Sequence, residues 1–325
     1  MSTPTQAQLL LRVANKTAQA EGVVSFRLVD ALGRALPGFA AGAHIDVQLG
    51  PDLVRQYSLC NPSRSPTEYE IAVLREPASR GGSKYMHETL AVGMEFPASA
   101  PKNHFQLDAH SPAFLFAGGI GITPLLAMAQ QLAEEGRQFE LHYCARSRQR
   151  AAFRERLAEA AYAGSVHFHY DEEAPSQRLD IASVLSRGSS AHHLYTCGPA
   201  GFIQHVLDAG RGAGWPESRM HREFFAAPAA DARATADGAF EVELASSGKR
   251  FVVPAGTTVL AVLTDAGIEV PASCEAGVCG TCVTRVVEGT PDHRDVYLTD
   301  AEHAKNDCFT PCCSRALSQR LVIDL

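Results

Sequence analysis

The stretch CEAGVCGTC, residues 274–282, places three cysteines close together, and CFTPCCSR, residues 308–315, supplies three more near the end of the chain. The other three of the nine cysteines, Cys60, Cys144 and Cys197, stand singly inside apolar segments. A single cysteine in such a segment ordinarily acts as a small buried hydrophobic residue. The gathering of six cysteines in the last quarter of the chain predicts a separate metal-binding domain there.

The spacing of Cys274, Cys279 and Cys282 indicates the kind of metal centre. C-x4-C-x2-C is typical of plant-type 2Fe-2S clusters, which take their fourth cysteine from a distant position. Gly277 and Gly280 lie between these cysteines, where the backbone must turn tightly and direct N–H groups at the sulfurs. Zinc is the alternative, but four-cysteine zinc sites usually combine two short C-x2-C pairs, and this stretch contains one.

The fourth ligand must come from Cys308, Cys312 or Cys313. If Cys312 and Cys313 are extended, their side chains point to opposite sides, so that only one of them can face the cluster. The spacing leaves the choice among the three cysteines open.

The sequence around these cysteines predicts a small sheet with one helix. Residues 239–256 alternate apolar and polar positions on either side of SSGK, which is a hairpin signal, and residues 257–267 have helical apolar spacing. CVTRVVEG and RLVIDL, residues 282–289 and 320–325, supply further strands. These elements predict a C-terminal β-grasp ferredoxin fold of the plant type.

Length and composition describe the whole chain. Its 325 residues are too many for a single hydrophobic core, which predicts two or three domains. Residues 226–239 are rich in Ala, Pro, Asp and Gly, a composition typical of a linker between domains. A net charge of -7 argues against nucleic-acid binding. The N-terminus lacks the pattern of a secretory signal, and no apolar run is long enough to cross a bilayer. We therefore expect a cytoplasmic, soluble protein.

The middle of the chain alternates strands and helices. Residues 113–136 form an apolar strand, a turn through Gly118, Gly119 and Gly121, and a helix that opens at Thr123-Pro124. Such a turn presents backbone N–H groups to a diphosphate, although it does not match the G-x-G-x-x-G fingerprint. Further alternation, ending in a Cys-Gly-Pro turn at 197–199, predicts a parallel sheet with helices on its faces and a ligand at its carboxyl edge.

The N-terminal region contains four strand-like runs separated by Gly, Pro and Asn-Pro turns. They are residues 23–30, 43–50, 54–61 and 69–76. Short strands with this punctuation predict an antiparallel β-barrel.

The cysteine segment, followed by PCCSR and the closing RLVIDL, resembles the ferredoxin domain of the phthalate dioxygenase reductase family, to which vanillate demethylase reductases also belong. In that family the last cluster ligand is followed by one variable residue and then Ser-Arg. The resemblance therefore implies that Cys312 is the fourth ligand and that Cys308 and Cys313 are bystanders.

GGIGITP and YTCGPAGF resemble the pyridine-nucleotide domain of the ferredoxin–NADP reductase superfamily. The resemblance implies that Gly118, Gly119, Gly121 and Thr123 bind the pyrophosphate. It also implies that the turn of Cys197, Gly198 and Pro199 lies beside the nicotinamide.

RQYSL, IAVLRE and RGGSKYMHETL resemble the flavin-binding motifs of the same superfamily. Arg55 would bind the flavin phosphate, Tyr57 would pack on the ring system, and Ser58 would hydrogen-bond near the redox-active nitrogen. The implied flavin-binding set also contains Gln56, the strand residues Ala72, Val73 and Leu74, and the phosphate-loop residues Gly81, Gly82 and Ser83. MHREFFAA resembles the segment in which Phe225 covers the flavin, so we expect Ser58, Thr123 and Phe225 to act in hydride transfer.

The order of the motifs implies the architecture and the flavin. The chain resembles the phthalate dioxygenase reductase family over nearly its full length, which implies an FMN-binding β-barrel at 1–108, an NAD-binding α/β domain at 109–226 and a 2Fe-2S ferredoxin domain at 239–325. Nicotinamide delivers two electrons as a hydride, the cluster accepts one, and a flavin can do both. No acid–base pair is required, so the histidines are given no catalytic role.

The resemblance thus implies an NADH-dependent reductase component of a Rieske-type aromatic oxygenase or demethylase. The alternatives are a free-standing NAD(P)H flavin or quinone reductase and a non-catalytic redox carrier or sensor. Arg146 and Arg148 follow a predicted strand and would favour NADPH if they met a 2′-phosphate, whereas the resemblance favours NADH. We expect a monomer, because its oxygenase partner must dock and leave quickly.

Overall fold

The computed structural model describes residues 8–50, 53–61, 66–77, 79, 81–226 and 238–325. The chain divides into two compact units, Met1–Glu223 and Phe224–Leu325. Most of the predicted linker, residues 226–239, lies outside the described residues.

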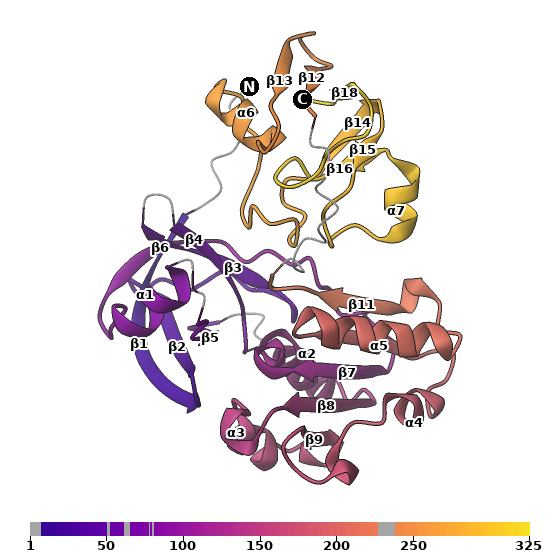
Figure 1. Cartoon of the computed structure of the whole chain (residues 1–325). Helices are drawn as coiled ribbons and strands as arrows, with labels where there is room; N and C mark the ends of the chain where they lie inside the picture. Colours follow the sequence, from indigo (N-terminus) through magenta and orange to yellow (C-terminus); the bar gives the residue numbers. More distant parts are fainter. Residues whose placement is uncertain (1–7, 51–52, 62–65, 78, 80, 227–237) are drawn as a thin grey trace. The chain divides into compact units, whose positions relative to one another are not determined.

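The first unit begins with a six-stranded antiparallel sheet in the order β4-β3-β6-β1-β2-β5 (Figure 1). An isolated bridge between Leu59 and Ile71 joins its two edges, so the sheet closes into a barrel. The predicted barrel is therefore confirmed, with two strands, β1 and β6, in addition to the four expected. The elements are β1 Gln8–Ala20, β2 Val23–Asp30, β3 His44–Gly50, β4 Leu53–Ser58, β5 Tyr69–Leu74, α1 Gly82–Glu88 and β6 Glu95–Ser99.

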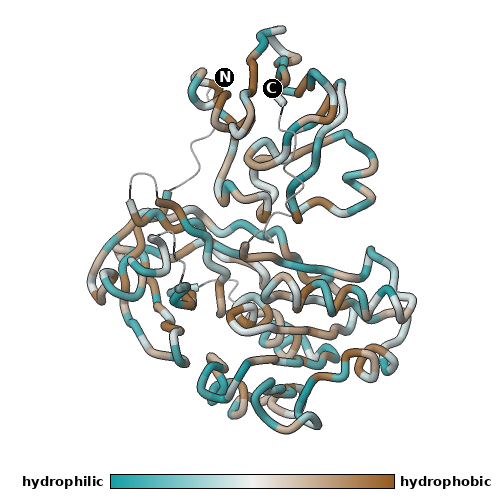
Figure 2. Tube along the Cα trace, viewed as in Figure 1, coloured by the Kyte–Doolittle hydropathy of each residue, from teal (hydrophilic) through white to brown (hydrophobic). Residues whose placement is uncertain are grey.

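A five-stranded parallel sheet in the order β11-β10-β7-β8-β9 forms the rest of the first unit. Helix α2 packs on one face and helices α4 and α5 on the other, as predicted for an α/β sheet (Figure 1). Hydrophobic and hydrophilic positions are interspersed along α5 (Figure 2), and Ile203, Val206 and Leu207 are among its buried residues. The strands are β7 Ala113–Gly118, β8 Phe139–Ala145, β9 Val166–Tyr170, β10 His193–Cys197 and β11 Met220–Glu223. The helices are η1 Gly119–Gly121, α2 Ile122–Glu134, η2 Arg148–Arg150, α3 Arg154–Glu159, η3 Ala163–Ser165, η4 Pro175–Gln177, α4 Ile181–Ser186, α5 Ala200–Gly212 and η5 Glu217–Arg219.

One hydrophobic cluster joins the barrel to the parallel sheet. Val23 and Ala72 of the barrel belong to the same buried group as Ala117 of β7 and Ile122 and Leu125 of α2. Strand β5 is thereby held against the glycine turn that follows β7.

The second unit is a small mixed sheet in the order β13-β12-β18-β14-β16 with α6 packed on it. The predicted hairpin is formed by β12 and β13, and the predicted helix is α6, where the Thr258 side chain accepts a hydrogen bond from the Ala261 N–H. This is the expected β-grasp arrangement. The elements are β12 Phe240–Leu244, β13 Arg250–Val253, α6 Val259–Asp265, β14 Thr284–Glu288, β15 Pro291–Asp292, α7 Asp300–Lys305, β16 Cys308–Phe309, β17 Arg315–Ala316 and β18 Arg320–Ile323.

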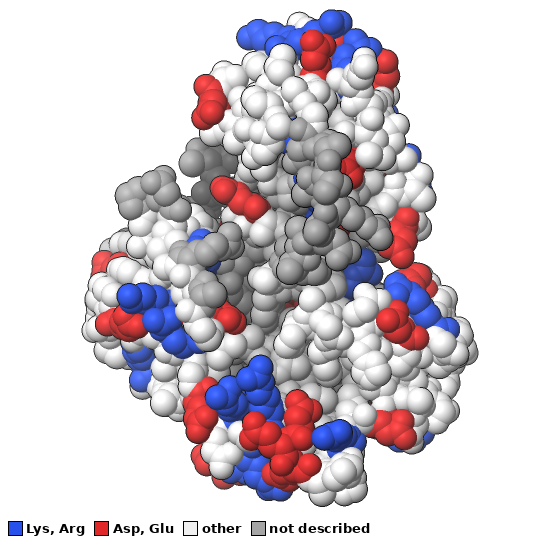
Figure 3. Space-filling view, viewed as in Figure 1, with Lys and Arg blue, Asp and Glu red and all other residues white. Residues whose placement is uncertain are grey.

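Charged side chains of both signs lie side by side over the face shown in Figure 3. Among the residues described on this face, basic and acidic groups are mixed, in keeping with the modest net charge of -7.

Candidate active site and cluster loop

Two turns predicted to bind the nucleotide lie against each other at the carboxyl edge of the parallel sheet. Strands β7 and β10 pair in parallel with Ala117 opposite Cys197, so the turns that follow them are neighbours. A Cβ atom on Gly121 would lie 2.1 Å from the carbonyl oxygen of Cys197, and one on Gly198 would lie 2.9 Å from the Cα atom of Gly118. Only glycine permits so close an approach of the two backbones.

The start of α2 completes this edge. The Thr123 hydroxyl donates to the Ile120 carbonyl at 3.0 Å, and Thr123 is buried. No side chain caps the N-terminus of α2 or of α5, which begins directly after Pro199. Uncapped backbone N–H groups at a helix start are suited to a diphosphate, so this edge fits a dinucleotide.

On the barrel side, Arg55 lies over the start of α1. A Cβ atom on Gly82 would lie 2.6 Å from Arg55 Cγ and 2.7 Å from Nε, so the absence of a side chain at Gly82 makes room for the arginine. Gly81 has φ +90° and provides no side-chain cap to the helix, and the Ser83 hydroxyl donates to the Ser79 hydroxyl at 2.9 Å. A guanidinium beside the N–H groups at the start of α1 fits the phosphate of a flavin mononucleotide.

The remaining predicted flavin residues are divided between the barrel wall and its interior. Ala72 and Val73 are buried on β5, Leu74 is partly buried, and Tyr57 is partly buried on β4, where burial raises its phenol pKa. The Gln56 amide donates to Asp46 at 3.0 Å and contacts the His44 ring at 3.2 Å. The Gln56 side chain is thus held by neighbouring barrel residues.

Glu223 is a site residue that the sequence reasoning missed. The Ser58 hydroxyl donates to Glu223 Oε2 at 3.4 Å, and Glu223 pairs with Cys197 in the β10–β11 register. Burial raises the pKa of the Glu223 carboxyl to about 8, and the hydrogen bond from Ser58 opposes that rise. The signal in the sequence was an acidic residue at the end of a strand on the edge where ligands bind.

Phe225 follows β11 by two residues and is 42% exposed. It belongs to the second unit, whereas Ser58 and Glu223 belong to the first. The covering role of Phe225 stays a prediction.

The predicted cluster ligands are brought together in the second unit. The Cys274 thiol lies within hydrogen-bonding reach of the Cys279 and Cys312 thiols, and Cys312 also reaches Cys282. The N–H of Ala276 donates to Cys274 Sγ at 3.4 Å.

The same donation recurs at Cys279, whose Sγ accepts from the Thr281 N–H at 3.5 Å. The loop can turn its N–H groups inward because Gly277 and Gly280 adopt φ of +70° and +72°. Four converging sulfurs with N–H donors fit a 2Fe-2S cluster.

The two other C-terminal cysteines have different surroundings. Cys313 Sγ lies 3.3 Å from Thr310 Oγ1 and faces Gly277, while Cys308 has acidic neighbours, including Asp307. Residues 311–313 form a turn and not the extended segment that the sequence argument supposed, because the Cys313 N–H donates to the Thr310 carbonyl at 3.2 Å. The Cys312 thiol reaches the Cys274 and Cys282 thiols, whereas the Cys313 thiol reaches Cys312, Thr310 and Ser314, which favours Cys312 as the fourth ligand.

A barrel and a parallel nucleotide sheet that share one core, together with a four-thiolate loop, define a class: pyridine-nucleotide oxidoreductases that use a flavin and an iron–sulfur cluster. Residues 242–317 match the family described as 2Fe-2S iron-sulfur cluster binding domain, and residues 115–208 match the oxidoreductase NAD-binding domain. No helix among the described residues is long and apolar enough to cross a membrane.

Whole-chain comparisons narrow the class. The chain is 54% identical over 94% of its length, and 96% of the relative's, to the vanillate O-demethylase oxidoreductase of a Pseudomonas species, strain HR199. It is 40% identical over the full length of both chains to the phthalate dioxygenase reductase of Burkholderia cepacia. A solved structure of phthalate dioxygenase reductase, described as modular for electron transfer from pyridine nucleotides to [2Fe-2S], matches with a TM-score of 0.73, 40% identity and 98% coverage of each chain.

The chain belongs to the phthalate dioxygenase reductase family. It is an NADH-dependent flavin iron–sulfur oxidoreductase with FMN and a 2Fe-2S cluster as its cofactors. The expected family, fold and cofactors are thereby confirmed.

Proposed function

We propose that this protein passes electrons from NADH to the terminal component of a Rieske-type aromatic oxygenase or demethylase. The high identity to a vanillate O-demethylase oxidoreductase over nearly the whole chain supports this choice of partner over a free-standing quinone reductase. A non-catalytic electron carrier would need neither the barrel nor the two turns at the carboxyl edge of the parallel sheet. The presence of both argues against that alternative. The substrate would be an aromatic compound that the oxygenase, and not this chain, selects.

One observation carries the proposal: Ser58 of the barrel, Glu223 of β11 and the Cys197 turn meet at the end of the parallel sheet. Bound FMN would supply the conversion between the hydride of NADH and the single electrons that a 2Fe-2S cluster accepts. The chain would then position the two reacting rings where barrel and sheet converge. The Glu223 carboxyl, with its pKa raised to about 8 by burial, would hold a proton at neutral pH within reach of the Ser58 hydroxyl.

The other residues would bind and orient. Arg55 and the turn at 81–83 would bind the flavin phosphate, and Tyr57 with the backbone at 72–74 would flank the ring system. The glycine turn at 118–121 and Thr123 would bind the pyrophosphate. In the same proposal, Gly198 and Pro199 would border the nicotinamide, Phe225 would cover the flavin, and Cys274, Cys279, Cys282 and Cys312 would bind the cluster.

The surroundings of Arg148 support NADH over NADPH as the donor. Its guanidinium binds the Glu173 carboxylate through Nε at 2.6 Å and Nη2 at 3.1 Å. An arginine already paired with a carboxylate is a weaker partner for a 2′-phosphate. Of the two arginines that would favour NADPH, Arg146, which is exposed, is then the one that remains to meet a 2′-phosphate.

We also propose the three domains at 1–108, 109–226 and 239–325, which the three main sheets support. Transient docking to the oxygenase, a monomeric state and a cytoplasmic location belong to the same proposal. Docking must be brief because each reductase has to serve many turnovers.

The test is to mix NADH, the purified holoprotein and a purified Rieske oxygenase without oxygen. Reduction of the oxygenase is measured from the change in its visible absorbance. We expect rapid reduction of a demethylase-type oxygenase and slow reduction of benzoquinone. Fast quinone reduction, with no Rieske protein reduced above the rate seen without the reductase, would overturn the proposed partner and favour the free-standing reductase.

A further inference from the structure

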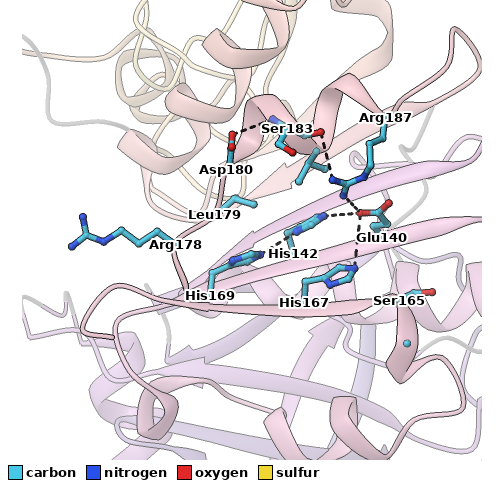
Figure 4. Close-up of a pocket in the computed structure, with 12 residues that line it drawn as sticks. Glu140, His142, Ser165, His167, His169, Arg178, Leu179, Asp180, Ser183 and Arg187 are labelled. Carbon is cyan, nitrogen blue, oxygen red and sulfur yellow. Dashed lines mark hydrogen bonds and ion pairs between the residues drawn. The ribbon is translucent and has the colours of Figure 1, made fainter. Parts of the chain in front are cut away.

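Strands β8 and β9 carry a cluster of histidines and one carboxylate that lie outside the predicted cofactor motifs. His142 of β8 pairs with His167 of β9, and Glu140 and His169 lie two residues along their strands on the same face. These side chains line a groove of about 670 Å³ beneath α4 (Figure 4). His142 is 3% exposed and stacks on His167 and His169 with ring centroids 4.9 Å and 5.3 Å apart.

A line of polar contacts runs through this cluster. The Gln177 carbonyl lies 3.2 Å from His169 Nδ1, His169 Nε2 lies 3.1 Å from His142 Nδ1, and His142 Nε2 lies 3.1 Å from Glu140 Oε2. Both ends of the line are oxygens that only accept. Three contacts therefore need three protons, whereas two neutral imidazole rings carry two. With both rings neutral, one contact must place two lone pairs face to face.

When the His142 proton is on Nδ1, it is donated to His169 Nε2, and the lone pair of His142 Nε2 then faces Glu140 Oε2 at 3.1 Å.

A metal ion satisfies both of these atoms. We propose that Glu140, His142 and His167 bind one Zn²⁺ ion, with water as the fourth ligand. One ligand atom from each residue lies within 4.8 Å of the others, and the distances to Glu140 Oε2 are 3.1 Å from His142 Nε2 and 3.9 Å from His167 Nε2. Ligands about 2.0–2.2 Å from a tetrahedral zinc lie roughly 3.3 Å apart, so small side-chain shifts complete the site.

The remaining histidine would position a ligand. With the His169 Nδ1–H donating to Gln177 and the His142 Nδ1–H donating to His169, the His142 Nε2 lone pair faces the metal. A hydrogen bond from the other ring nitrogen is the usual support of a metal-bound histidine. Two imidazoles and one carboxylate suit zinc and other late divalent ions, and the site goes beyond the electron-transfer function.

Arg187 sets the affinity of this site. Its Nη2 lies 2.5 Å from Glu140 Oε2, the oxygen that faces both histidines, and its side chain is 49% exposed. The guanidinium therefore competes with the metal for the carboxylate and can swing into solvent when the metal binds. Arg187→Gln should tighten zinc binding, a result that a purely structural role for the histidines would not produce.

The experiment is calorimetric titration of the holoprotein with ZnCl₂, with the visible spectrum monitored to show that the cluster and flavin stay intact. We expect one zinc per chain and a rise in melting temperature. His169→Gln removes a residue that supports a ligand and should weaken zinc binding roughly 10–100-fold. His167→Gln removes a ligand itself and should weaken zinc binding by more than that; its side chain is 44% exposed. His205→Gln, at an exposed position on α5, is the matched control and should bind as the parent does.

The ferredoxin unit holds a second group of this kind, His293, Asp295 and His303, which the titration must separate from the first. No zinc binding by the intact holoprotein would overturn the proposal. So would zinc binding that His167→Gln leaves unchanged, or that His303→Gln abolishes in its place.

Discussion

Gly121→Ala tests whether contact between the two nucleotide turns controls hydride transfer. The added Cβ would lie 2.1 Å from the Cys197 oxygen, 2.3 Å from its carbonyl carbon and 2.6 Å from the Gly198 nitrogen. All three are backbone atoms, so no side chain can rotate away. Ordinary contact is about 3.5 Å, and the turns must therefore separate by about 1 Å. Overpacking of this kind costs about 1–3 kcal/mol.

The functional loss should exceed the loss of stability. A displacement of about 1 Å can slow a reaction about 100-fold, because the reacting atoms leave their near-attack geometry. Anaerobic stopped-flow reduction of the flavin by NADH gives the rate and the apparent NADH affinity, and thermal unfolding gives the stability. Gly201→Ala is the control, since a Cβ there has no neighbouring atom within 4 Å. If Gly121→Ala reduces its flavin at the parent rate and affinity, the turns do not position the nucleotide.

The remaining predictions concern the cluster and the buried carboxyl. Cys312→Ser should abolish the visible absorbance of the cluster and Cys313→Ala should keep it; the reverse pattern would make Cys313 the ligand. Cys279→Ser should lose the cluster yet keep reduction of the flavin by NADH. If the variant is folded and holds its flavin but NADH no longer reduces it, hydride transfer is not a function of the first unit alone. The folded-state pKa of Glu223 is raised from 4.5 to about 8, so its ionisation should destabilise the fold progressively as pH rises through that window. In Glu223→Gln the melting temperature should change less between pH 5 and 8 than it does in the parent. If the melting temperatures of variant and parent depend on pH in the same way, the pKa of Glu223 is not raised.

Local sequence determined the elements whose chemistry depends on spacing alone. The intervals between Cys274, Cys279 and Cys282 identify the cluster, because three ligands on one short loop must meet the same metals. The glycine turn after β7 and the Cys-Gly-Pro turn after β10 are likewise visible, since each combines a strand end with residues that permit a tight turn. The hairpin and the helix of the ferredoxin unit follow from apolar periods of 2 and 3.6.

Two barrel strands were not anticipated. β1, Gln8–Ala20, keeps no regular alternation because bulges interrupt its pairing with β2, and β6, Glu95–Ser99, is a short strand that contains a proline. Their place in the sheet comes from pairing with partners distant in the sequence, which a local pattern does not contain.

Tertiary structure alone decided which side chains meet across elements. Ser58 and Glu223 are 165 positions apart, and only the shared core of barrel and sheet, with the β10–β11 register, brings them to 3.4 Å. The Glu140, His142 and His167 cluster likewise requires the β8–β9 register, since a shift of one residue would turn His167 to the opposite face. Spacing in a sequence specifies local geometry, whereas contacts between strands depend on a register that the packing of the whole core selects.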